Sequence, residues 1–263
     1  MRAAWLSRGN AGEREYGTKD KNMLTLIAAA AALTATSTDP VTASFASNEH
    51  HEFSAEEMAL INERLDQIHA TVDTWLPHVS DDVNVRVEPV NRPMLDMIGG
   101  VTGRADTPDE VLIEISVTYP GGIEAAVDAG LGSTFAHELH HTAHGWTMQG
   151  NHYGHGIQIA VITEGLANVF AEELLGQASP EPMQPPAEVE EWALEILTLP
   201  QRANYGEWMF AHPDGRLAVG YRTGSWVVRR AMERSGLSIV ELSERTPSTI
   251  WRLAGFEWDR EMP

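Results

Sequence analysis

Apolar residues recur at alternating spacings of three and four between Ser54 and Pro77. The series is Met58, Ile61, Leu65, Ile68, Val72 and Trp75, and this spacing places one apolar stripe along a helix. Ser54 and Glu57, three residues apart, form a capping-box pattern at its start, and Pro77 ends it. The pattern therefore predicts an amphipathic helix over this stretch.

Two later segments alternate apolar and polar residues, which is typical of half-buried strands. They cover residues 83–87, with three valines, and 111–117, with four β-branched residues on one face. Residues 97–104 between them hold three glycines and predict a turn or a flexible flap over a cleft. This part of the chain predicts a small sheet.

Helical spacing dominates the rest of the chain. Helices are expected at 123–129, 132–145, 157–175, 188–199, 221–235 and 238–245. Residues 177–187 contain four prolines and predict a surface loop. The order predicts an α+β fold, with an α+β part at 47–130 and a mainly helical part at 131–263.

The first residues are typical of a secretory leader. Lys19 and Lys21 precede an apolar run at 23–33, and small residues follow up to position 46. The run is shorter than the roughly 20 residues that a membrane-spanning helix needs. We therefore expect a signal peptide at 1–46 and an exported, periplasmic or secreted, domain at 47–263. The alternatives are an uncleaved leader that anchors the protein to the membrane and an Ala-rich helix of the folded domain.

Composition and charge exclude several classes of function. The 263 residues carry 18 Lys plus Arg against 38 Asp plus Glu, a net charge of −20, which disfavours binding to nucleic acid or to an anionic membrane surface. The absence of cysteine excludes disulfides, thiol catalysis and Cys-ligated metals. Eleven histidines remain as candidate metal ligands.

Residues 137–141 contain the pattern His-Glu-x-x-His within a predicted helix. Residues four apart lie on the same face one turn along, so His137 and His141 can direct their imidazoles at one point, which suits Zn²⁺. Glu138 lies beside this face and can reach a metal-bound water as a general base without being a ligand.

Zinc needs a further protein ligand. The metzincin pattern is absent, because Thr147 occupies the position of its third histidine, and His144 could reach the metal only if the helix broke at Gly145. Glu164, on the next predicted helix, completes a His₂Glu site with an open position. Asn168, one turn further on, can accept the second ring N–H of His137 and fix its tautomer.

These residues resemble a known family. Residues 136–141 followed by 163–170 resemble the gluzincin arrangement of zinc peptidases, and more closely a bacterial domain family of predicted Zn-dependent proteases. The likeness extends over 208–210 and 220–226, and so over about residues 80–255. It implies a zincin-like fold: a small sheet whose edge strand binds an extended peptide, a catalytic helix beneath it, and a helical lower half. The family often has Asp where this chain has Asn168, and Asn raises the basicity of His137 less.

The sequence thus predicts a zinc metallopeptidase that acts on a peptide or protein substrate, with Glu138 as the base. The resemblance places a Gly-Tyr motif at Tyr221, which is the first candidate for the oxyanion donor, and Arg222, His212 and Tyr153 are alternatives. An aminopeptidase, a non-peptidase zinc hydrolase and a non-catalytic zinc-binding or interaction protein stay open. Glu138 argues against the last, because a structural metal has no use for that carboxylate. The other histidines of the region are expected to be neighbours of the ligands, surface residues or substrate contacts: His140, His144, His152 and His155.

Overall fold

The apolar stripe after Ser54 forms helix α1 (Ala55–Asp73) in the computed structural model, which describes residues 40–258. The Ser54 hydroxyl accepts the backbone N–H of Glu57, and the Glu57 carboxylate accepts the backbone N–H of Ser54. Ile61 and Leu65 on the stripe are completely buried. The predicted helix and its capping box are confirmed.

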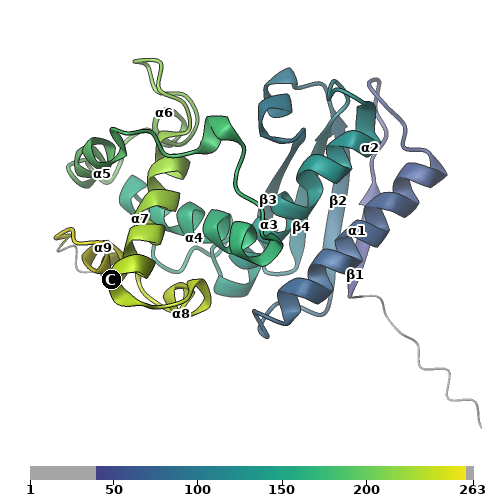
Figure 1. Cartoon of the computed structure of the whole chain (residues 1–263). Helices are drawn as coiled ribbons and strands as arrows, with labels where there is room; N and C mark the ends of the chain where they lie inside the picture. The colour runs from purple at the N-terminus through teal and green to yellow at the C-terminus, as the bar shows by residue number, and fades with distance from the viewer. Residues whose placement is uncertain (1–39, 259–263) are drawn as a thin grey trace, which may run out of the picture. The chain divides into compact units, whose positions relative to one another are not determined.

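Four strands form a mixed sheet in the order β1-β2-β4-β3. The strands are β1 (Val41–Phe45), β2 (Val83–Val90), β3 (Val101–Thr107) and β4 (Glu110–Ser116). β2 pairs in parallel with both β1 and β4, whereas β3 pairs antiparallel with β4. Helix α1 and the later helix α3 cross one face of this sheet (Figure 1). Because β3 is last in the strand order, it is an edge strand, and it contacts α3.

Strand β1 corrects the boundary that the sequence analysis placed at residue 46. Val41 pairs with Val83 and Phe45 with Val87, so these residues are part of the folded sheet. Five residues of alternating burial are too few to stand out beside an Ala-rich run. The rest of the expected leader, residues 1–39, lies outside the described residues.

Strand β3 corrects the expected flap at 97–104. Residues Pro93–Ile98 form a 3₁₀ helix, η1, and the chain then enters β3 directly. Gly99 and Gly100 adopt φ values of 96° and 77° at this junction, which explains the glycines. Gly103 lies inside the strand, opposite Ile113 of β4. Gly99 and Gly100 thus form the tight turn before β3, whereas Gly103 is a residue of the strand itself.

The helical part follows the predicted order. Its elements are α2 (Gly122–Ala126), the π-helical segment η2 (Val127–Leu131), α3 (Gly132–His144), α4 (Ile157–Leu175), the 3₁₀ turn η3 (Glu181–Met183), α5 (Val189–Leu197), α6 (Tyr205–Met209), α7 (Val219–Ser235), α8 (Ile239–Ser243) and α9 (Pro247–Leu253). The patterns missed α6 and α9, which are too short to show a period. Within residues 40–258, no helix is both long and apolar enough to cross a membrane.

Helix α3 continues from α2 through η2, where the sequence predicts a break between 129 and 132. Leu131, which precedes α3, has helical dihedral angles and no side-chain cap is present. A Cβ on Gly130 would lie 2.5 Å from the carbonyl oxygen of Gly99, so glycine is needed for this close approach. The contact brings the start of β3 onto the helix that carries the His-Glu-x-x-His pattern.

Helices α4 and α7 cross at a pair of glycines. A Cβ on Gly165 would lie 2.3 Å from the carbonyl carbon of Gly224, and one on Gly224 would lie 2.1 Å from the Val161 carbonyl oxygen. The two backbones thus touch directly. Glu164 and Tyr221 lie within one turn of this crossing, so the glycines bring α7 next to the candidate ligands.

Candidate metal centre

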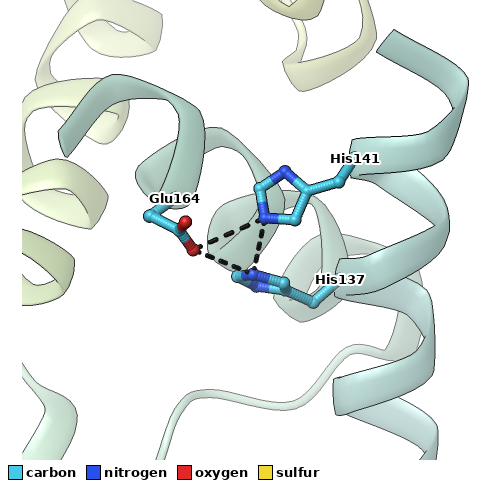
Figure 2. A group of neighbouring side chains, drawn as sticks. All are labelled: His137, His141 and Glu164. Atoms are coloured by element: carbon cyan, nitrogen blue, oxygen red, sulfur yellow. Dashed lines mark hydrogen bonds and ion pairs between the residues drawn. The ribbon is translucent and has the colours of Figure 1, made fainter. Parts of the chain in front are cut away.

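Side chains from α3 and α4 meet at one point between the two helices (Figure 2). The Nε2 atoms of His137 and His141 are 2.9 Å apart, and the Glu164 carboxylate oxygen Oε2 lies 3.1 Å from the first and 3.4 Å from the second. His141 is buried, and the other two side chains are largely buried. Among the described residues this is the group of His, Asp and Glu side chains whose ligand atoms converge closely enough to hold a metal ion.

The hydrogen bonds around His137 fix its tautomer. Its Nδ1 lies 2.9 Å from Oδ1 of Asn168, while Nδ2 of Asn168 donates to the Ser225 hydroxyl at 3.3 Å. Ser225 in turn donates to the Tyr221 carbonyl oxygen at 3.1 Å. Asn168 therefore presents its oxygen to His137, which must donate from Nδ1. The Nε2 of His137 then faces His141 and Glu164, and in the neutral ring this nitrogen carries the lone pair that a metal ion would accept.

This donor set fits a zinc ion. A tetrahedral Zn²⁺ with ligands at its usual bond lengths separates them by about 3.3 Å, close to the three separations observed. Two imidazoles and one carboxylate are also a ligand set that catalytic zinc accepts.

Electrostatics at Glu164 agree with a cation-binding role. Burial by itself raises the pKa of this carboxyl group. The charge of His141 and the hydrogen bonds from both histidines outweigh burial and hold the pKa of Glu164 well below its ordinary value. The carboxylate is therefore ionised at neutral pH.

Glu138 lies between the centre and strand β3. Its side chain is buried, and burial raises the pKa of its carboxyl group, while the adjacent His137 and His141 oppose that shift. The backbone N–H of Ala105 donates to the carboxylate. A Cβ on Gly103 would lie 2.7 Å from Cγ of Glu138, so the strand leaves room for this side chain only because residue 103 is glycine.

A tyrosine pair on the other side of the centre includes a residue that the sequence analysis missed. The Tyr205 hydroxyl donates to Oε1 of Glu164 at 3.5 Å, and the Tyr221 hydroxyl is hydrogen-bonded to Tyr205. Burial, followed by the charge of Glu164, raises the pKa of both phenols, so both keep their protons. Tyr205 lies in the five-residue helix α6, where no pattern marks it.

The other candidate donors are engaged away from the centre. Arg222 donates to the Gln184 carbonyl oxygen at 2.8 Å and lies over the Trp192 ring. His212 pairs with Asp214 at 2.8 Å. The Tyr153 ring packs against Trp146 with centroids 5.8 Å apart.

The remaining histidines of this region lie around the ligands. His140 is fully buried, and its Nε2 lies 2.8 Å from the Ser243 hydroxyl on α8. His144 packs against His140, with ring centroids 4.6 Å apart, and does not join the three converging side chains. His152 lies over Gly145, and His155 lines a cavity of about 190 Å³ that Tyr205 also lines.

Comparison with known proteins adds one finding. A family model described as "Predicted Zn-dependent protease (DUF2268)" matches residues 62–252, which include all the side chains described above. A search of the curated proteins gives no match.

Proposed function

Because the chain belongs to the family of predicted Zn-dependent proteases, we propose that it is a zinc metallopeptidase of the gluzincin type that hydrolyses peptide bonds. The observation that carries this proposal is the convergence of two imidazole nitrogens and one carboxylate oxygen within 3.4 Å of one another, with the buried carboxyl group of Glu138 beside them. A site that only binds a metal ion has no need of the Glu138 carboxyl group.

His137, His141 and Glu164 are the proposed zinc ligands. Bound zinc would supply Lewis-acid chemistry, which polarises a substrate carbonyl and makes water acidic enough to attack near neutral pH. Asn168 orients the His137 ring by accepting its Nδ1–H. Such partners of ligands typically contribute about 10- to 100-fold in metal affinity.

Glu138 is the proposed general base. Its carboxylate accepts a proton from the attacking water and then returns it to the nitrogen of the leaving amine, so no net proton stays on the protein. Burial and the Ala105 N–H hold the carboxylate in one place. The raised pKa brings Glu138 closer to neutrality, where a carboxyl group both accepts and returns a proton efficiently.

The tyrosine pair is the proposed source of the oxyanion donor. Both phenols stay protonated, so each has an O–H to offer to the negative charge that develops on the carbonyl oxygen. Tyr205 donates to Glu164 directly, whereas Tyr221 reaches it through Tyr205. Tyr205 thus joins Tyr221 as a donor candidate.

The test compares Glu138→Gln with Glu164→Ala, using zinc content by elemental analysis and hydrolysis of a peptide library by mass spectrometry. We expect Glu138→Gln to keep one zinc per chain and to lose at least 1,000-fold in kcat, because it keeps the shape of the site but has no base (about 4 kcal/mol of barrier). Glu164→Ala should lose the zinc as well. Cleavage by Glu138→Gln at the parent rate would refute the assigned mechanism.

A further inference from the structure

Strand β3 has one row of backbone groups with no strand beside it, because it lies at the edge of the sheet. The N–H of Ser116 donates to the carbonyl oxygen of Gly100, which fixes the phase of the antiparallel ladder. Since hydrogen-bonded and non-hydrogen-bonded positions alternate, Val101, Gly103 and Ala105 direct their N–H and C=O groups outward.

The chain's own groups engage the carbonyl oxygen of Val101 and both backbone groups of Ala105. The carbonyl oxygen of Val101 accepts the Thr134 hydroxyl of α3 at 3.4 Å. At Ala105 both groups are used: the N–H donates to Glu138, and the carbonyl oxygen accepts the N–H of Met148 at 3.0 Å. An incoming peptide would have to displace these contacts to pair there.

The segment that closes Ala105 is anchored in the core. Trp146 is 7% exposed and Thr147 is 3% exposed, while the Met148 side chain is 71% exposed. The Trp146 ring packs on Tyr153 and against His140. The backbone at Met148 is thus held against β3, although its side chain faces solvent.

Gly103 is the position that stays open. No hydrogen bond joins its outward groups to another described residue, and its Cα faces Glu138, where a Cβ would lie 2.9 Å from the carboxylate oxygen Oε1. A peptide whose scissile bond lies at Glu138 therefore meets β3 at this residue.

We propose that substrate pairs with the β3 edge at Gly103 alone, so that the protein recognises short peptides rather than an extended stretch of polypeptide. This inference rests on the proposed function. Extended peptides that add a strand to a sheet edge gain main-chain hydrogen bonds at alternate residues. Here both groups of Ala105 and the carbonyl oxygen of Val101 are already engaged, so an extended peptide gains little on either side of Gly103.

The test measures binding as a function of peptide length. Peptides with the same central residue pair, blocked at both ends, are extended from four to ten residues, and their dissociation constants for zinc-loaded Glu138→Gln are measured by calorimetry. Gln keeps an oxygen that accepts the Ala105 N–H. We expect the dissociation constants to change by less than about threefold over the series. A tightening of about tenfold or more with length, as two further main-chain hydrogen bonds would give, overturns the inference.

A matched pair of variants tests whether the Met148 N–H closes the Ala105 position to substrate. Met148→Pro removes the N–H that occupies the Ala105 carbonyl oxygen, whereas Met148→Ala keeps it. In otherwise wild-type protein, long peptides should gain in kcat/KM over short ones only with Met148→Pro. Equal length dependence in the two variants counts against closure by Met148. If the parent protein cleaves no peptide of the series, the proposed function itself fails.

Discussion

At the scale of single residues, the centre depends on which ring nitrogen of each histidine faces it. The spacing of the two motifs suggested that Asn168 accepts a hydrogen from His137, and the structure places those two atoms 2.9 Å apart. His141 has no such partner: its Nδ1 is buried and makes no hydrogen bond to a described residue. The two candidate ligands from α3 are thus held unequally, His137 by a hydrogen bond and His141 by packing.

Gly103→Ala tests whether β3 positions Glu138. The glycine does not have a positive φ, so alanine suits the backbone, but its Cβ would lie 2.7 Å from Cγ of Glu138 and must displace that side chain. We expect kcat to fall by at least tenfold, with zinc content unchanged. Steady-state kinetics and elemental analysis measure the two effects.

Gly132→Ala is the matched control for that substitution. Its new Cβ meets Ile68 at an ordinary 3.4 Å, so kcat should stay within about twofold of the parent. In a Glu138→Ala background, which lacks the Cγ that the new Cβ would meet, Gly103→Ala should cost less free energy of unfolding than in the parent. Equal costs in the two backgrounds would show that residue 103 does not act through Glu138.

Tyr205→Phe and Tyr221→Phe test the tyrosine pair. Each substitution removes one hydroxyl and keeps the ring. We expect Tyr205→Phe to lower kcat by about 10- to 100-fold, because its hydroxyl contacts Glu164 directly. The double variant should lose little more than Tyr205→Phe, since Tyr221 reaches Glu164 through Tyr205. Fully additive losses in kcat would mean that the two hydroxyls act independently.

At the scale of secondary structure, the long periodic segments were predictable and the short ones were not. The predicted helix at 157–175 has the observed bounds of α4, and that at 132–145 exceeds α3 by one residue. Residues 97–104 were interpreted as a turn or a flexible flap because they hold three glycines, and strand β3 begins within them. Its position is set by pairing with β4 and by contact with α3, and neither leaves a pattern in the sequence.

The close crossing of α4 and α7 was likewise invisible to the patterns. Gly165 and Gly224 stand out in the sequence only as parts of the two motifs that resemble the family. In the structure they are the residues where the two helix backbones touch. The crossing explains why these glycines accompany Glu164 and Tyr221.

Gly224→Ala should therefore destabilise the fold. Its Cβ would lie 2.1 Å from the Val161 carbonyl oxygen and 3.0 Å from Cα of Gly165, so the helices must separate. We expect a loss of about 3 kcal/mol in the free energy of unfolding, measured by denaturant titration. Gly206→Ala in α6 is the control, since the nearest atom lies 3.5 Å from its new Cβ. If both variants unfold at the same midpoint, the crossing does not need glycine.

At the scale of the whole molecule, the net charge narrows the possible partners but does not identify a substrate. The net charge of −20 disfavours polyanionic partners but says nothing about which peptide is cleaved. The α+β fold, with a four-stranded mixed sheet followed by helices, is confirmed. Export stays a prediction, because most of the expected leader lies outside the described residues.

Zinc should stabilise the folded protein as a whole, since its proposed ligands come from two different helices. An ion that binds only the native state adds about 4 kcal/mol when its free concentration is a thousand times its Kd. Thermal unfolding of the metal-free parent should therefore shift to higher temperature on addition of zinc. Glu164→Ala should show no such shift. A shift of equal size in that variant would place the stabilising ion elsewhere.

The proposed function requires that His137, His141 and Glu164 hold one zinc ion. Anomalous diffraction recorded at the zinc absorption edge from crystals of the zinc-loaded protein tests it most directly. We expect a single strong peak about 2.0–2.2 Å from Nε2 of both histidines and from one carboxylate oxygen of Glu164. A zinc peak coordinated by other side chains, or the absence of a peak between α3 and α4, would contradict it.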